Sequence, residues 1–179
     1  MKLIDKKKNI AFILILNIIF LLFIVALMTG CIGNETALKD GDKNITTEMD
    51  EVISNYIIQK YSTSYLDTEK QFEVHKVYGT SESEGILSVY MWSYYGGFNK
   101  ATSTENQAGH SLPAVIRLKK DTDHYSVIEY KEPQNGNLYQ SSLKRMFPEK
   151  YLKFAQDDSG NKKDLQKEMD KKVNQWLEE

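Results

Sequence analysis

The sequence is poor in cysteine, and this scarcity excludes several classes of protein. Its 179 residues include one Cys, three Pro and three His, so neither a disulfide framework nor a zinc site built from several cysteines is available. The first thirty residues hold four lysines and one acid, which leaves 19 basic and 24 acidic side chains for the remainder. A net charge of −5 over residues 31–179, without a cluster of basic residues, argues against nucleic acid as a partner.

The longest apolar run of the sequence lies near its beginning, at residues 10–29, which hold no charged residue, and lysines precede it. At about 1.5 Å per residue, a helix of this length would just cover a hydrocarbon core of roughly 30 Å. The positive-inside rule places the preceding lysines in the cytoplasm and everything after Thr29 outside. We therefore expect residues 1–30 to be a signal peptide or a membrane anchor.

The segment Leu27-Met28-Thr29-Gly30-Cys31 resembles the lipobox of bacterial lipoproteins, although Met28 departs from the Leu usual at that position. In that family a diacylglycerol is attached to the Cys thiol and the signal peptide is cut just before it. The resemblance implies lipid attachment at Cys31 and a place on the extracytoplasmic face of the cell membrane. The alternative is an uncleaved transmembrane helix in which Cys31 has no special role.

The sequence after Cys31 divides into a polar tether and one domain. Residues 31–45 include the stretch GNETALKDGDKN, which is too polar to order itself by burying apolar area. Residues 46–179 are numerous enough to build one hydrophobic core. Met49, Val52, Ile53, Tyr56 and Ile57 recur at helical spacing and predict a helix over residues 48–61, with Thr47 as its N-terminal cap.

The period then changes to that of strands. We expect two hairpins, with strands at 71–79, 86–95, 112–119 and 125–131 and turns at 80–85 and 121–123. Beyond Gly136 the apolar spacing is helical again, and the final helix, capped by Asn161, places Leu165, Met169 and Val173 on one face. This order predicts an α+β fold: an N-terminal helix packed on a four-stranded antiparallel sheet, with C-terminal helices, in a cystatin-like or nuclear-transport-factor-like arrangement.

Motifs of catalysis and metal binding are missing from the sequence. His75, His110 and His124 are expected in a strand, a loop and a hairpin turn, without the spacing that would place two metal ligands on one face. A G-x-S-x-G elbow and an H-E-x-x-H motif are also absent. We therefore expect no metal site, no cofactor and no enzymatic activity.

The most unusual local composition is the aromatic run 90–95, followed by a polar segment, 96–111, that we expect to be a long loop. Alternation along a strand places Tyr90, Trp92 and Tyr94 on one face. Two arrangements are open. In the first, these rings fill the core under the first helix, and the C-terminal helices cover Leu87, Val89 and Met91. In the second, the rings line a ligand surface. In the second case the candidate ligand-binding residues are Trp92, Tyr94, Tyr95 and His110.

A second resemblance is carried by Ser111-Leu112-Pro113, by VIEYKEP at 127–133, by Gly136 with Tyr139, and by Phe147-Pro148. Residues 50–153 are similar to the extracytoplasmic C-terminal segment of antirepressor-type membrane metallopeptidases of the beta-lactam-sensor family in Firmicutes. The chain lacks the zinc motif and the several membrane spans of that peptidase, so no catalytic residue carries over. The resemblance implies an envelope-exposed module with a sensory or ligand-binding role.

Together these patterns predict a membrane-tethered lipoprotein whose domain binds an envelope protein or a small ligand and performs no chemistry. A sensory or regulatory role is favoured because the similar segments belong to signal-transducing proteins. Two alternatives stay open: an inhibitor or immunity-like protein, and a small envelope hydrolase that uses acids near residues 96–111.

Overall fold

The computed structural model describes residue 43 and residues 45–157 and 162–179. The predicted signal or anchor segment, Cys31, nearly all of the tether and the Asn161 cap lie outside the described residues. In the described part of the chain, no helix combines the length and the apolar character needed to cross a bilayer.

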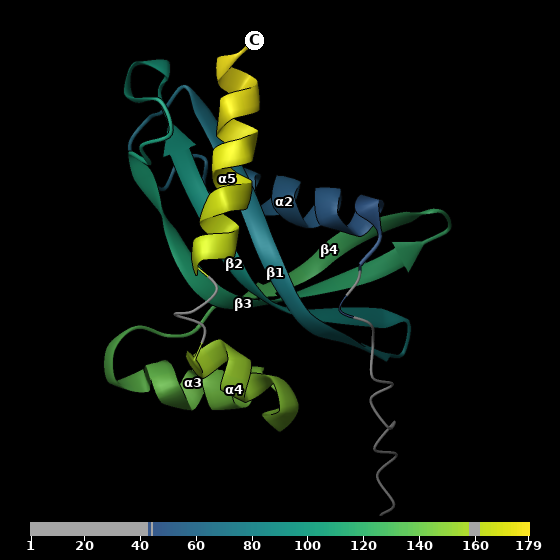
Figure 1. Ribbon diagram of the computed structural model, residues 1–179. Coiled ribbons are helices and arrows are strands. Elements are labelled where there is room, and N and C mark those ends of the chain that lie inside the picture. Colours follow the sequence, from purple (N-terminus) through teal and green to yellow (C-terminus); the bar gives the residue numbers. More distant parts are fainter. Residues whose placement is uncertain (1–42, 44, 158–161) are drawn as a thin grey trace, which may run out of the picture. The chain divides into compact units, whose positions relative to one another are not determined.

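Four strands form one antiparallel sheet in the order β1-β2-β3-β4 (Figure 1). The elements are α2 (Thr47–Tyr61), β1 (Lys70–Ser83), β2 (Ile86–Phe98), β3 (Ala108–Asp121), β4 (His124–Lys131), α3 (Tyr139–Met146), α4 (Glu149–Asp157) and α5 (Lys162–Leu177). The predicted α+β class with a four-stranded antiparallel sheet is confirmed. Because each strand pairs with its neighbour in the sequence, β1 and β4 are the two edges.

Helix α2 covers one face of this sheet. It begins one residue earlier than the sequence predicts, and the cap is Thr46, whose hydroxyl accepts a hydrogen bond from the backbone N–H of Met49 at 3.2 Å. Its buried stripe includes Ile53 and Ile57. The stripe packs against six residues of the two central strands: Val89, Met91, Tyr95, Ala114, Ile116 and Leu118.

Helices α3, α4 and α5 pack on the opposite face (Figure 1). Together with Phe147, which lies between α3 and α4, they contribute seven buried residues to a second core: Leu143, Phe147, Tyr151, Ala155, Leu165, Met169 and Val173. From the sheet, Tyr90 and Trp92 meet these helices, whereas Val89 and Met91 face α2. The predicted assignment of faces is therefore wrong: the C-terminal helices, not the first helix, cover Tyr90 and Trp92.

Both hairpins extend further than the sequence predicts. Strand β1 continues to Ser83, so the first turn consists of Glu84 and Gly85, whose φ angles are 53° and 72°; such two-residue turns match the twist of the flanking strands. The predicted loop 96–111 is also wrong, because Gly96 pairs with Gly109 and the connection is confined to residues 99–107. A Cβ atom at Gly109 would lie 2.1 Å from the carbonyl oxygen of Tyr95, so this pairing requires glycine.

Candidate functional site

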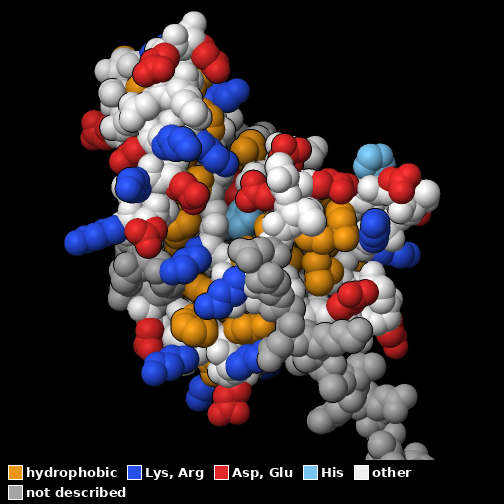
Figure 2. All heavy atoms as spheres, turned by 45° about the vertical axis from the view of Figure 1, so that its right-hand side comes forward, with side chains coloured by type: hydrophobic (Ala, Val, Ile, Leu, Met, Phe, Trp, Pro, Cys, Tyr) orange, Lys and Arg blue, Asp and Glu red, His pale blue; other side chains and the backbone are white. Residues whose placement is uncertain are grey.

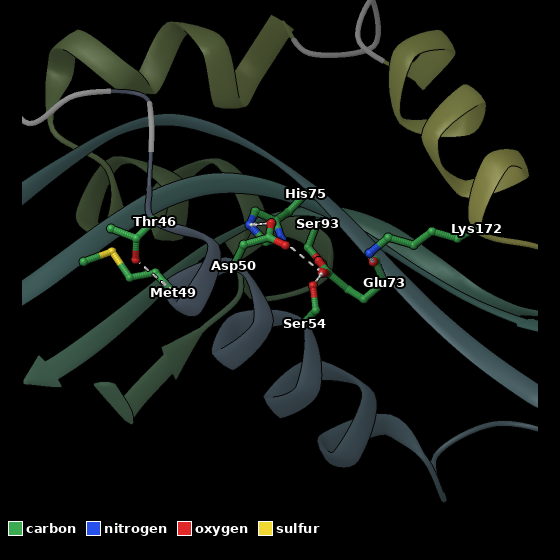
Figure 3. Close-up of polar contacts among 8 residues, drawn as sticks. All are labelled: Thr46, Met49, Asp50, Ser54, Glu73, His75, Ser93 and Lys172. Atoms are coloured by element: carbon green, nitrogen blue, oxygen red, sulfur yellow. Dashed lines mark hydrogen bonds and ion pairs between the residues drawn. The ribbon is translucent and has the colours of Figure 1, made fainter. Parts of the chain in front are cut away.

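A carboxylate and an imidazole are buried together between α2 and the sheet (Figure 3). Glu73 and His75 lie two residues apart on β1 and therefore point to the same face. The Glu73 side chain is fully buried and that of His75 is 2% exposed, and the His75 Nδ1 atom lies 3.0 Å from Glu73 Oε2. Two hydroxyls also donate hydrogen bonds to this carboxylate: Ser54 donates to Oε2 at 2.8 Å and Ser93 donates to Oε1 at 2.6 Å.

Two further charged side chains join this network from the two helical layers. The Asp50 Oδ1 atom, on α2, lies 3.3 Å from His75 Nε2, and the Asp50 side chain is 52% exposed. From the other side of the sheet, the Lys172 ammonium of α5 donates a hydrogen bond of 2.9 Å to the backbone carbonyl of Glu73 (Figure 3). The network thus connects α2, β1, β2 and α5.

The pair shifts the pKa of each of its members. Burial alone would lower the pKa of His75, but the charge and hydrogen bond of Glu73, helped by Asp50, hold it above the ordinary value. Burial alone would raise the pKa of Glu73, but the positive charge on His75 and the hydrogen bonds from His75, Ser93 and Ser54 hold it below its ordinary value. Both shifts favour an imidazolium–carboxylate pair, which is how a charge is tolerated inside a protein.

This geometry is that of a structural network rather than of a nucleophilic site. A serine nucleophile would have to share its hydroxyl hydrogen with the imidazole, whereas Ser54 and Ser93 both donate to the Glu73 carboxylate. A cleft of about 330 Å³ adjoins His75 between β1 and α5. It is lined by His75, Lys76, Asp164, Leu165, Lys167, Glu168 and Lys171. Figure 2 shows basic and acidic side chains interspersed over α5, without an area of one sign.

Two of the predicted ligand-binding residues, Trp92 and Tyr94, lie on the α5 face. Trp92 is buried, and its indole N–H donates to the Ser111 hydroxyl at 2.7 Å. Tyr94 is partly buried; its hydroxyl donates to Gln166 Oε1 and accepts from Asn106 Nδ2, each at 3.2 Å. A cleft of about 220 Å³ opens beside it, lined by Tyr94, Ser111, Leu165 and Gln166.

The other two, Tyr95 and His110, lie on the α2 face. Their rings stack with centroids 5.5 Å apart, and the Tyr65 hydroxyl lies 2.8 Å from His110 Nδ1. The Tyr61 and His110 rings meet edge to face with centroids 4.4 Å apart, so aromatic rings surround the imidazole, and burial lowers the pKa of His110. His110 belongs to β3, not to a loop as predicted. The structure therefore brings the four predicted residues together as two pairs, one on each face of the sheet.

The central pair of the polar network, Glu73 and His75, was not among the residues predicted from the sequence. The available signal was the spacing Glu-x-His within a predicted strand, which places both side chains on one face. Among the residues that the structure describes, no group of three or more His, Cys, Asp or Glu could hold a metal ion. The connection 99–107 contains one acid, Glu105, and the Glu69 carboxylate lies beside it, where it accepts a hydrogen bond of 3.2 Å from the backbone N–H of Lys100.

The function of the chain has to be inferred from its own residues. Comparison with protein-family models, with curated proteins and with solved structures finds no match.

Proposed function

We propose that the chain is a lipoprotein held on the extracytoplasmic face of the cell membrane by lipid on Cys31. Its domain, residues 46–179, is a non-catalytic binding module with a sensory or regulatory role. The anchor is supported by the uncharged run 10–29 and the lipobox-like segment that ends at Cys31. A cystatin-like or nuclear-transport-factor-like arrangement is part of the proposal, supported by α2 packing on one face of a four-stranded antiparallel sheet.

The observation that carries the binding role is the cleft beside Tyr94. Ligand sites combine aromatic or apolar walls with a few placed polar groups, and here a partly buried ring meets Asn106, Ser111 and Gln166 from three different segments. Its volume of about 220 Å³ is smaller than the roughly 300–1,000 Å³ of sites for larger ligands. We infer that it receives one ring of a sugar or one side chain of a peptide.

The buried Glu73–His75 pair supports a non-catalytic role for the sheet interior. Both Glu73 oxygens accept hydrogen bonds within the domain, and His75 is held between two carboxylates. A buried carboxylate and imidazole held in this way stabilise one arrangement of the layers, and we place the contact with a partner at the clefts of the α5 face.

Replacing Cys31 with Ser is expected to abolish lipid attachment, since serine lacks the thiol that carries the diacylglycerol. Intact-protein mass spectrometry of the membrane fraction should show the wild-type chain without residues 1–30 and with added acyl mass. The variant should be an uncleaved precursor or should leave the membrane. A Cys31→Ser chain that stays membrane-bound at the mature size would contradict the anchor.

Replacing Tyr94 with Phe should weaken ligand binding at the α5 face, because the ring stays while the two hydrogen bonds that hold Gln166 and Asn106 beside the cleft are lost. The probes are N-acetylglucosamine and a tri-alanine peptide, titrated into the isotope-labelled chain and followed by NMR. One of them should shift the signals of Tyr94, Ser111 and Gln166, and the variant should bind it with a loss of about 1–2 kcal/mol, roughly 5- to 30-fold.

The matched control is Tyr125→Phe, because Tyr125 lies on β4 at the tip of the second hairpin and does not line this cleft. It should bind the probe as tightly as the wild type. If neither probe shifts the signals of the cleft residues, the cleft is not a site for sugars or peptides.

A further inference from the structure

We infer that the end of the domain formed by α3 and α4 faces the membrane and rests on anionic lipid headgroups. This inference depends on the proposed anchor at Cys31, and it adds which surface of the domain meets the bilayer and what chemistry attracts it.

The first argument is the place where the chain enters the domain. The Lys43 ammonium lies over the ring of Phe154 in α4, 5.7 Å from its centroid. The tether predicted from the sequence is short: twelve residues, 32–43, follow Cys31 up to and including Lys43. A chain of that length cannot exceed about 40 Å even when fully extended. A lipid on Cys31 therefore keeps the Lys43–Phe154 contact within about 40 Å of the bilayer.

The second argument is the apolar surface at this end. Four large hydrophobic side chains are exposed among the described residues, and two of them belong to this end: Leu138, just before α3, is 50% exposed, and Phe154, within α4, is 46% exposed. One side of the Phe154 ring stacks on Tyr78 of β1 at 5.7 Å, which fixes its position while nearly half of it stays in solvent. Exposed aromatic side chains next to lysines are typical of surfaces that lie against the interface of a bilayer.

The third argument is charge. Helices α3 and α4 carry four basic residues, Lys144, Arg145, Lys150 and Lys153, and two acidic residues, Glu149 and Asp157. They are therefore net positive, although the chain after residue 30 is net negative. Figure 2 shows hydrophobic side chains with Lys and Arg beside them at the lower end of the molecule, the end that α3 and α4 form in Figure 1.

Basic and apolar groups share one face of α4. Lys150, Lys153 and Phe154 stand at positions i, i+3 and i+4, which are neighbours on a helix surface. Each basic side chain near an anionic membrane is attracted to it, and this attraction falls off within a Debye length. Two or three such residues would be weak alone, but the lipid anchor already confines the domain near the surface, so a weak contact is enough to orient it.

The test uses the full lipoprotein. Its only cysteine, Cys31, carries the lipid, so a cysteine introduced elsewhere is the one thiol that a label can reach. Gln156→Cys in α4 and Asn174→Cys near the end of α5 replace exposed residues and receive an environment-sensitive fluorophore. Vesicles contain phosphatidylcholine alone or with phosphatidylglycerol. With the anionic lipid, the emission of the fluorophore at position 156 should shift to the blue and increase, and high salt should reverse the shift. The emission of the fluorophore at position 174 should stay at the wavelength it has in water.

The charge requirement has a matched control. The blue shift at position 156 should be lost in a double variant of α4, Lys150→Glu with Lys153→Glu. It should be preserved in a double variant of α5, Lys167→Glu with Lys171→Glu, which makes an equal charge change at exposed positions. Water-like emission from both labels on anionic vesicles, with the acylated chain still bound to them, overturns the docking surface and leaves the anchor intact. A chain that carries no acyl mass overturns the anchor, and the docking surface with it.

Discussion

Replacing His75 with Ala is expected to lower the free energy of unfolding by about 3–5 kcal/mol, because it leaves the Glu73 carboxylate charged, fully buried and without its cation. Urea denaturation, followed by the fluorescence of Trp92 and Trp176, which both pack in the core on the α5 face, measures the loss. The matched control is His124→Ala: this histidine lies in the second hairpin with its side chain 89% exposed, and its removal should change stability by no more than about 0.5 kcal/mol.

A double-mutant cycle separates the pair from its surroundings. Glu73→Gln removes the buried negative charge and preserves the shape of the side chain. If the two residues stabilise each other, the loss in the double variant should differ from the sum of the single losses by about 0.5–3 kcal/mol. Strictly additive losses would show that each side chain acts alone, and they would contradict the coupled pair described above.

The same pair sets a pH window for stability. The pKa of His75 is raised above its ordinary value of 6.5 in the folded chain, so its contribution is complete below pH 6.5 and is lost as the pH rises through the folded value. The pKa of Glu73 is lowered below its ordinary value of 4.5, so its contribution is present above pH 4.5 and is lost as the pH falls through the folded value. The contributions of both groups are present between these limits, and the His75→Ala variant should lose the alkaline decline.

Replacing Met169 with Ala should cost about 2–5 kcal/mol, the range for removing most of a fully buried side chain. Met169 is 0% exposed and packs α5 into the core of the second face. The neighbouring residue Glu168 is exposed, so Glu168→Ala should have almost no effect. A stable Met169→Ala variant, with fast hydrogen exchange confined to α5, would show that this helix folds onto the sheet as a separate unit.

The two faces of the sheet provide a further control for this experiment. Ile53, also 0% exposed, belongs to the core between α2 and the sheet. Because the sheet separates Ile53 from Met169, the losses of Ile53→Ala and Met169→Ala should add within about 0.5 kcal/mol. A strong deviation from additivity would show that the layers are coupled, and the network from Asp50 to Lys172 is the connection that would carry it.

Local patterns were sufficient to predict the elements but not the side of the sheet on which each helix lies. The spacing of Met49, Ile53 and Ile57 predicts a helix with one apolar face, and this helix is present. However, β2 is a central strand that is apolar on both faces, with Tyr90 and Trp92 on one and Val89 and Met91 on the other. Nothing in its alternation tells which face meets the first helix, so the predicted coverage was reversed.

The glycine residues after the aromatic run were misleading for a different reason. Gly96 and Gly97 resemble the end of a strand when read alone, but Gly96 continues the ladder opposite Gly109, where a Cβ would collide with the neighbouring backbone. A glycine that permits close pairing and a glycine that ends a strand have the same sequence signature. The difference depends on a partner that lies thirteen residues away.

The buried network was beyond prediction because its partners come from separate elements. A glutamate in a strand is ordinarily exposed, and Glu73 becomes buried only because Ser54 of α2, Ser93 of β2 and His75 reach the same carboxylate. Each of these residues is unremarkable in its own segment. Their convergence follows from the packing of the layers, and no spacing along the chain encodes it.

The hydrogen bond from Lys172 to the carbonyl of Glu73 has a consequence for how neighbouring molecules meet. Strand β1 is an edge of the sheet, and the carbonyl oxygens of an edge strand are acceptors for a strand of another molecule. At this position the acceptor is already used by an ammonium group of the same chain. An intruding strand would have to displace that lysine, so α5 protects β1 against the edge-to-edge association that leads to aggregation.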